Sequence, residues 1–307
     1  MPSLGYELGL NGPNEVMYST AVSYPSTIAA LKALGATVSR QQIASTSMTV
    51  GQVQPYYNAC QAAGIQLVLV ETLPDPLPNT TTHAANLATV AAACPDIWWE
   101  IGNEPDQVPA ISASLYPAFF SAAVTAIKAA DPTCKIGPCP VSNINGGGGG
   151  QTWLAAAFTA GLAAIPYDFL PFHNYPYPTA LPPTTAWSGP YTAITLIPQF
   201  TAWATGQGNT KPYWNTECGW QDVDTSASPN MTAALQASYM VTYLQAIAGY
   251  GLPVVIPYAM YDSGSQAYGW MDQFNYNLSN QYYTPRDVYT AVQALTTSDA
   301  GNFFLFL

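Results

Sequence analysis

The sequence predicts a single (β/α)₈ barrel, and three observations support this fold class. Short apolar runs alternate with longer helical stretches eight times along the 307 residues. Such alternation is typical of a parallel sheet covered by helices, and one barrel needs roughly 250 residues before insertions. No GxGxxG motif follows the first strand, which argues against a dinucleotide-binding fold. We therefore expect residues 1–307 to form one TIM-barrel domain.

Strands are expected where apolar and β-branched residues are concentrated. The clearest is Ile65–Glu71 (IQLVLVE), whose nearly continuous apolar run is typical of a strand buried on both faces. The other seven are expected at Tyr6–Asn11, Ala36–Arg40, Ile97–Ile101, Lys135–Cys139, Asp168–Phe172, Pro212–Asn215 and Val254–Tyr258.

Helices are expected between these strands, and several have recognisable ends. Ser26–Leu34 and Val50–Ala63 are each followed by a glycine, a common helix stop. The remaining helices are expected at Thr82–Ala93, Tyr116–Ala130, Trp153–Ile165, Ile194–Ala204, Met231–Tyr250 and Pro285–Leu295. The glycine run Gly146–Gly150 lacks the Lys-Ser/Thr of a phosphate loop, so we expect a flexible loop after the fifth strand, with a functional lid as the alternative.

Composition excludes several classes of partner. Only 7% of the residues are charged, against about 25% in typical domains, and the net charge is −11. Nucleic acid and anionic membrane surfaces attract clustered Lys and Arg, so neither is an expected partner. No stretch approaches the roughly 18–20 apolar residues of a membrane span. Scarce lysine with abundant Thr, Tyr and Ala favours a secreted protein, and we expect a monomer whose signal peptide is absent from the start MPSLGYELGL.

Cysteine and histidine are too sparse for an obvious metal centre. The five cysteines form no CxxC pair, and the two histidines form no HxH pair. We therefore expect no metal and no cofactor. Cys60 and Cys94, which each end a helical stretch, are either a disulfide or two buried free thiols.

Two of the six glutamates follow predicted strands in unusual settings. Glu104 lies in IWWEIGNEPD after the fourth strand, and Glu217 lies in PYWNTECGW after the seventh. Active sites of these barrels lie at the carboxyl ends of the strands, so the two carboxylates are expected to face each other there. Arg40, which ends the second strand, is the one basic residue expected in the same cleft. Glu100 shares strand parity with Glu104, so it is a candidate buried partner of Arg40.

The motif Asn103–Glu104–Pro105, together with Glu217, resembles the clan A glycoside hydrolases, which include cellulases, mannanases, β-xylosidases and heparanase-like β-glucuronidases. The eight-unit layout extends the resemblance over the whole chain. It implies a retaining β-glycoside hydrolase with Glu104 as the acid/base and Glu217 as the nucleophile. Such enzymes place the two carboxyl groups roughly 5–5.5 Å apart, one protonated and one ionised. The alternative is that both are ordinary polar residues at strand ends.

The same resemblance implies roles for further residues. Asn103 matches the residue that binds the sugar 2-hydroxyl, and Arg40 matches the arginine that keeps the nucleophile ionised. His173 and Tyr175 match a His-x-Tyr pair whose tyrosine contacts the nucleophile. Trp270 resembles the aromatic platform under the sugar, with Trp220 and Tyr261 as weaker candidates; the alternative for each aromatic residue is core packing.

Two features bear on the substrate. Many clan relatives carry an extra β-sandwich domain that has no room here, which favours an open-cleft, endo-acting enzyme. Lys and Arg are nearly absent from the predicted catalytic face, which favours a neutral polysaccharide over a uronide. The alternatives are an exo-acting β-glycosidase, including a β-glucuronidase-like enzyme, a catalytically inactive carbohydrate-binding barrel, and a metal-dependent barrel hydrolase.

Overall fold

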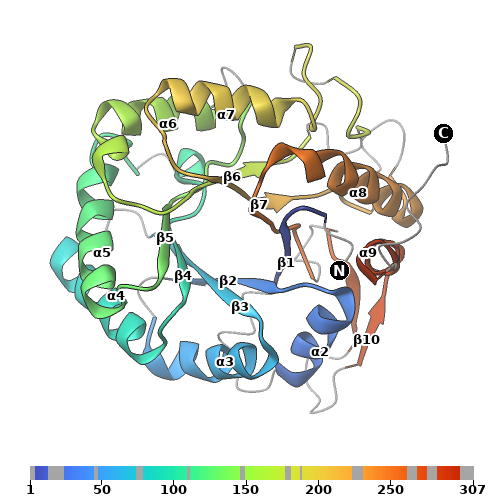
Figure 1. The fold of residues 1–307 in the computed structure, drawn as a ribbon, viewed down its shortest axis with the longest axis horizontal. Coiled ribbons are helices and arrows are strands. Elements are labelled where there is room, and N and C mark those ends of the chain that lie inside the picture. Colours follow the sequence, from blue (N-terminus) through green and yellow to red (C-terminus); the bar gives the residue numbers. More distant parts are fainter. Residues whose placement is uncertain are drawn as a thin grey trace.

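Eight parallel strands form a nearly closed barrel surrounded by helices (Figure 1), which confirms the predicted fold class. The computed structural model describes residues 4–12, 24–44, 48–73, 79–108, 111–145, 149–176, 181–186, 189–222, 231–260, 268–274 and 282–297. No helix in these ranges is long and apolar enough to cross a membrane.

The barrel strands follow one another around the sheet in the order β5-β4-β3-β2-β1-β8-β7-β6. Their bounds are β1 (Glu7–Asn11), β2 (Val38–Ala44), β3 (Gln66–Thr72), β4 (Trp98–Ile101), β5 (Lys135–Pro138), β6 (Leu170–Asn174), β7 (Tyr213–Cys218) and β8 (Val254–Val255). The backbone nitrogens of Asp168 and His173 donate to the carbonyls of Ile136 (2.8 Å) and Val141 (3.3 Å), which joins the chain around β5 to that around β6. All carboxyl ends therefore meet at one mouth of the barrel.

The helices lie outside the barrel, where each covers the strands beside it (Figure 1). Their bounds are α2 (Tyr24–Leu34), α3 (Val50–Ala63), α4 (Thr80–Ala93), α5 (Tyr116–Ala130), α6 (Gly149–Thr159), α7 (Leu196–Gly206), α8 (Ala233–Ile247) and α9 (Asp287–Thr297). Thr49 and Gln52 form a capping box at the start of α3, and Gly64 ends it in the left-handed conformation (φ 70°). The glycine stop predicted for this helix is thus confirmed.

The glycine run differs from its prediction. Gly146–Gly148 lie outside the described residues, whereas Gly149 and Gly150 form the start of α6, four residues before the predicted helix start. A Cβ on Gly150 would lie 2.3 Å from the carbonyl oxygen of Asn143, so this close approach requires glycine. The helix ends earlier than predicted, at Thr159, because Gly161 takes φ 105° and begins the short 3₁₀ helix η3 (Leu162–Ala164).

A short antiparallel hairpin, β9 (Met271–Phe274) and β10 (Tyr282–Pro285), was not expected from the sequence. The last helix therefore begins later than predicted. Pro285 belongs to β10, and α9 begins at Asp287. The described β8 is also shorter than predicted. The chain nevertheless continues beside β7 beyond it, since the nitrogen of Tyr258 donates to the carbonyl of Cys218 at 2.8 Å.

Apolar side chains close the amino-terminal half of the barrel interior. Inside the strands, a separate core cluster contains Val38, Val68, Val70, Trp98, Phe169, Trp214, Val254 and Ile256. The ring of Phe169 stacks on Trp214 with centroids 3.6 Å apart, and Trp98 lies 4.8 Å from Trp214. Because these rings fill one end of the barrel, polar side chains on the same strand faces collect at the other end.

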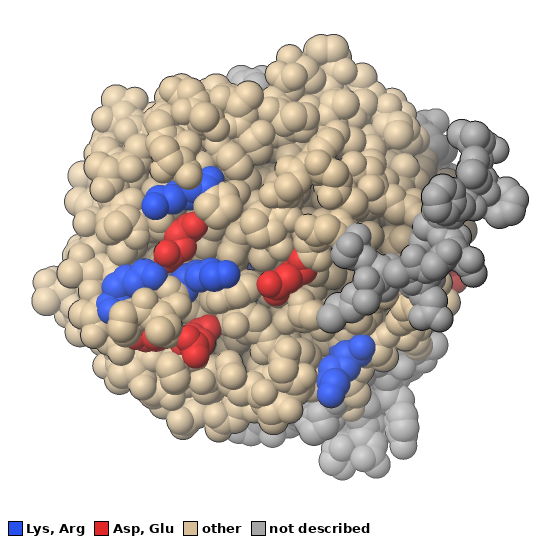
Figure 2. Space-filling view, in the orientation of Figure 1, with Lys and Arg blue, Asp and Glu red and all other residues tan. Residues whose placement is uncertain are grey.

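The surface carries few charges. In the view of Figure 2, most of the surface is uncharged, and the acidic and basic side chains gather mainly on one side. Lys128 on α5 pairs with Asp168 at 2.9 Å, and Lys135, the first residue of β5, lies 4.2 Å from the centroid of Trp98. Their positions, on a helix and at the amino end of a strand, are as predicted, so these lysines lie away from the barrel mouth.

All five cysteines are buried and unpaired. Cys60 and Cys94 are therefore two buried free thiols in this structure, the second of the two predicted alternatives. Burial raises the pKa of Cys60 to about 12 and that of Cys94 to about 11. A thiol that is protonated and covered in this way is a poor nucleophile and a poor metal ligand.

Candidate active site

Glu104 is held at the barrel mouth by a strained turn that follows β4. Gly102 takes φ 105°, and Glu104 itself takes a left-handed φ of 45°, rare for a residue with a side chain. A Cβ on Gly102 would lie 2.8 Å from the Cβ of Cys139 and 3.0 Å from Leu73. The Glu104 nitrogen donates to the carbonyl of Pro140 at 3.0 Å, so the turn is tied to the segment after β5. The side chain of Glu104 is 27% exposed and lines a cavity at the barrel mouth.

Glu217 occupies the carboxyl end of β7, and both of its carboxylate oxygens accept hydrogen bonds. Arg40 Nη1 donates to Oε1 at 2.6 Å, and the Tyr175 hydroxyl donates to Oε2 at 2.7 Å. Burial by itself favours the neutral acid, but the charges of His173 and Arg40 and these two hydrogen bonds outweigh it. They hold the pKa of Glu217 below its usual value. This carboxylate is therefore ionised and fixed in orientation.

Arg40 connects the polar groups at the centre of the mouth. Besides Glu217, its guanidinium donates to Glu100 Oε2 from Nε (2.9 Å) and Nη2 (2.7 Å). It also donates to the amide oxygens of Asn11 (2.7 Å) and Asn103 (2.9 Å). Burial disfavours its charge, but Glu100 and Glu217 reverse this effect and raise the pKa of Arg40. The predicted partnership of Arg40 with a buried Glu100 is confirmed.

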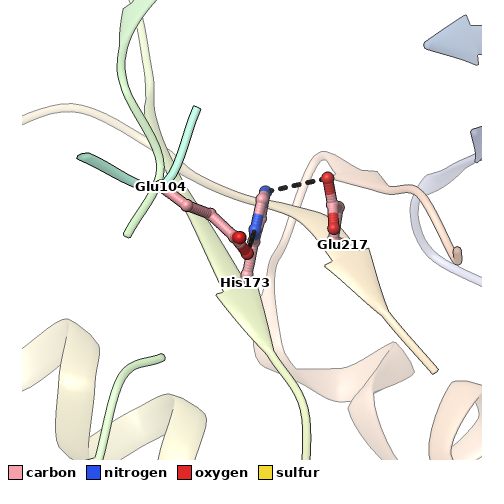
Figure 3. A group of neighbouring side chains, drawn as sticks. All are labelled: Glu104, His173 and Glu217. Atoms are coloured by element: carbon pink, nitrogen blue, oxygen red, sulfur yellow. Dashed lines mark hydrogen bonds and ion pairs between the residues drawn. The ribbon is translucent and has the colours of Figure 1, made fainter. Parts of the chain in front are cut away.

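His173 lies between the two predicted catalytic glutamates (Figure 3). Its Nδ1 is 2.7 Å from Glu104 Oε1, and its Nε2 is 3.5 Å from Glu217 Oε1. The pairing of β6 with β7 shifts register between Phe172 and His173, which is where the imidazole turns toward the mouth. One carboxylate oxygen of Glu104 and one of Glu217 lie within 4.8 Å of each other. Two carboxyl groups this close can take different protonation states, one ionised and one neutral.

Glu104 and Glu217 border a cavity of about 420 Å³, whereas the predicted site residues Arg40 and His173 lie behind its lining. Four of its lining residues, Asn103, Glu104, Tyr175 and Glu217, were predicted site residues. The seven other lining residues were not predicted: Gln42, Gln107, Ser142, Asn143, Pro176, Tyr258 and Tyr268. Gln42 could have been found from its place near the end of a strand. The rest lie in connecting segments whose side-chain directions leave no signal in the sequence.

The predicted tryptophan candidates do not reach this cavity. Trp220 has no exposed surface, donates to the carbonyl of Leu181 at 2.8 Å, and lies 5.4 Å from the ring of Tyr243. Trp270 is also fully buried and does not line the cavity. Neither is placed to stack on a sugar, because the hydrophobic contacts around both rings cover them completely.

Tyrosines provide the aromatic surface instead. Tyr258 and Tyr268 line the cavity, and their ring centroids lie 6.4 and 5.5 Å from that of Tyr175. Both come from the chain after β8, the region in which the sequence predicted an aromatic platform. Tyr261, the third aromatic candidate, lies outside the described residues.

Within the described residues, Glu104, His173 and Glu217 form the one group with the spacing of a metal site. Both Glu217 oxygens already accept a hydrogen bond, Oε1 from Arg40 at 2.6 Å and Oε2 from Tyr175 at 2.7 Å. A guanidinium so close to the ligand atom would repel a divalent cation. The donor set therefore fits acid–base and nucleophilic chemistry better than metal binding.

No family model and no curated protein matches the chain, but solved structures do. The cellulose synthase subunit Z of Clostridioides difficile superposes with a TM-score of 0.64 at 12% identity, over 94% of this chain and 99% of that one. An endo-1,4-β-mannanase from Rhizomucor miehei gives 0.61 at 17% identity, over 86% and 89%. An endo-β-1,3-glucanase from Amycolatopsis mediterranei, solved with laminarihexaose, gives 0.59 at 17% identity, over 94% and 98%. Over nearly its whole length, the chain shares its fold with these proteins.

Proposed function

We propose that this protein is a retaining β-glycoside hydrolase in which Glu217 is the nucleophile and Glu104 is the acid/base. The observation that carries the proposal is the pair of carboxylates with oxygens within 4.8 Å, both on one polar cavity at the barrel mouth. Their environments differ as the two roles require. Glu217 is nearly buried and held ionised by Arg40, whereas Glu104 is more exposed and contacts His173.

In the first step, a carboxylate oxygen of Glu217 attacks the anomeric carbon and the glycosidic bond breaks. Glu104, protonated, transfers its proton to the departing oxygen, so the leaving group departs as an alcohol. Asn103, held by Arg40 at 2.9 Å and lining the cavity, is placed to bind the sugar 2-hydroxyl. The products are a glycosyl ester on Glu217 and the free leaving group.

In the second step, Glu104 acts as a base. It removes a proton from water, the water oxygen bonds to the anomeric carbon, and the ester bond to Glu217 breaks. Glu104 regains its proton and Glu217 its negative charge, so the site returns to its starting state. Two displacements at the same carbon retain its configuration. Arg40 and Tyr175 then stabilise the regenerated carboxylate through the hydrogen bonds that the free enzyme shows.

A neutral polysaccharide cleaved within the chain is the substrate we favour. Among the described residues that line the cavity there is no lysine or arginine. Arg40, beneath the cavity, already forms ion pairs with Glu100 and Glu217. A uronate would thus meet Glu104 and Glu217 without a free cation. The mannanase and the glucanase with the same fold are both endo-acting by name. Secretion, which composition favours, and a monomeric state complete the proposal.

The test compares wild type with Glu217→Ala and Glu104→Ala on neutral β-linked polysaccharides and aryl β-glycosides. The matched control is Glu7→Ala, because Glu7 is an exposed glutamate at the opposite end of the barrel. We expect retention at the anomeric carbon by NMR, no detectable turnover by Glu217→Ala, and a loss of about 10²–10⁴-fold for Glu104→Ala on substrates that need protonation.

Azide separates the two roles. With an activated aryl glycoside, azide can replace the missing Glu217 and give an α-glycosyl azide after one displacement. With Glu104→Ala, azide intercepts the glycosyl-enzyme and gives a β-glycosyl azide after two. Exchanged products would reverse the assignment. Inversion by wild type, or full activity of Glu217→Ala, would refute the mechanism.

A further inference from the structure

The cavity has two chemically different walls. Beside Glu217 the wall is aromatic and contains Tyr175, Tyr258 and Tyr268. Beside Glu104 it is made of Gln107, Ser142 and Asn143, which carry amides and a hydroxyl and no aromatic ring. The three residues of this second wall, called here the amide wall, have no part in the proposed bond cleavage.

The amide wall is built onto the segment that carries the proton donor. The nitrogen of Gln107 donates to the carbonyl of Glu104 at 3.0 Å, within the 3₁₀ helix η2 (Pro105–Gln107) and its preceding residue. The Asp106 carboxylate accepts two hydrogen bonds from Ser142. The backbone nitrogen donates to Oδ1 at 2.9 Å, and the hydroxyl donates to Oδ2 at 2.5 Å. These bonds lock the segment after β4 to the segment after β5, so the wall keeps a constant position relative to Glu104.

Hydrogen bonds within the wall leave one amide oxygen and one amide nitrogen wholly available to a ligand. Gln107 uses its amide nitrogen to donate to Ser142 Oγ at 2.7 Å, which leaves its amide oxygen. Asn143 uses its amide oxygen to accept from the nitrogen of Asn145 at 2.8 Å, which leaves its amide nitrogen. Neither remaining atom has a hydrogen-bond partner among the described residues. Both Asp106 oxygens accept hydrogen bonds from Ser142, and Asp106 is not among the residues that line the cavity. The groups that the amide wall offers to a ligand are therefore neutral.

We propose that the amide wall binds the leaving group of the substrate and that this group is a neutral sugar. The inference rests on the proposed function, because the acid must approach the departing oxygen and therefore the leaving group lies on the Glu104 side. A sugar fills such a site with hydroxyls that pair with one amide oxygen and one amide nitrogen. An aryl or alkyl leaving group gains little there, since no ring face is available for stacking. The amide wall thus selects glycans over simple glycosides.

The test measures a selectivity ratio. It divides kcat/KM for the shortest oligosaccharide that the wild type cleaves by kcat/KM for the dinitrophenyl β-glycoside of the same sugar. The aryl group needs little protonation and few contacts, so the ratio reports both leaving-group recognition and proton donation by Glu104. The basic limb of kcat/KM for the oligosaccharide, which should coincide with that of wild type, separates the two. The variants are Gln107→Ala, whose side chain is exposed, and Asn143→Asp, which keeps the acceptor for Asn145 and removes the amide donor. Gln66→Ala, an amide truncation at the amino end of β3, is the control.

We expect each wall variant to lower the ratio about 5- to 10-fold, the effect of one lost hydrogen bond in a binding site, while the control leaves it unchanged. A ratio that stays constant in both wall variants, or one that falls equally in the control, overturns the amide-wall assignment and leaves the proposed function intact. Absence of cleavage by wild type of every oligosaccharide and also of the aryl glycoside is a different result. It would refute the proposed function, and the assignment would fall with it.

Discussion

Arg40 shows how one side chain determines the state of the residues around it. Its guanidinium is buried, and it contacts Glu100, Glu217, Asn11 and Asn103 within 2.9 Å. A buried guanidinium without such partners would destabilise the fold. Removal of Arg40 would leave the buried carboxylates of Glu100 and Glu217 without a compensating charge. The arrangement therefore keeps Glu217 ionised and at the same time holds Asn103 in place.

The acidic limb of activity should depend on Tyr175. Its hydroxyl donates to Glu217 Oε2 at 2.7 Å and is one of the groups that hold the pKa of Glu217 below its usual value. Tyr175→Phe removes this bond, so the pKa of Glu217 should rise. Since the nucleophile must be ionised, activity should then be lost at a higher pH as the solution is acidified. The measurement is kcat/KM from pH 3 to 7 for wild type and variant.

Tyr250→Phe is the control for that profile, because Tyr250 is exposed on the 3₁₀ helix η4 (Ala248–Tyr250) after α8. We expect its acidic limb to coincide with that of wild type. An unchanged limb in Tyr175→Phe would mean that Arg40 and His173 determine the ionisation of Glu217 without help from this hydroxyl.

At the scale of elements, the turn after β4 places the proton donor. Gly102→Ala puts a Cβ at φ 105°, 2.8 Å from Cys139 and 3.0 Å from Leu73, and the backbone must move. We expect a loss of about 2 kcal/mol in the free energy of unfolding, from overpacking and the unfavourable φ together. Activity should fall by more than stability explains, because Glu104 lies two residues further on. Denaturant unfolding and kcat/KM measure the two effects.

Gly51→Ala is the matched control. Gly51 lies in the first turn of α3, and a Cβ there meets no atom within 4 Å. The substitution should leave activity unchanged and stabilise the fold by a few tenths of a kcal/mol up to about 1 kcal/mol, because alanine restricts the unfolded chain. Equal behaviour of the two variants would contradict the role assigned to the turn.

Most elements were predictable because their patterns are local. The bounds of α3 and α5 agree with the prediction at both ends, since a periodic apolar face ends at a glycine or before a strand. The hairpin was missed because β9 pairs with β10 and, among the described residues, neither joins the strand–helix alternation of the barrel. The start of α6 was missed because Gly150 is favoured there by contact with Asn143, which no periodicity reveals.

For the whole molecule, the five buried cysteines predict the behaviour of the thiols. Without reductant, the folded protein should react slowly with a thiol reagent, and the unfolded protein should release five equivalents. Burial raises the pKa of Cys134 to about 12, as it raises those of Cys60 and Cys94, so little thiolate is present at pH 8. Three equivalents on unfolding would instead reveal one disulfide, with Cys60 and Cys94 as the first pair to examine.

The sequence by itself determined the order of eight strand–helix units, the glutamates at the ends of β4 and β7, and the placement of Arg40 and Glu100 beside them. These features follow from local periodicity and from the rule that parallel strands bring their carboxyl ends together. Only the tertiary structure decided which aromatic side chains reach the cavity. It buried Trp220 and Trp270 and exposed Tyr258 and Tyr268 to the cavity, and it assembled the amide wall. The direction of a loop side chain depends on packing between segments far apart in the chain, which no local pattern records.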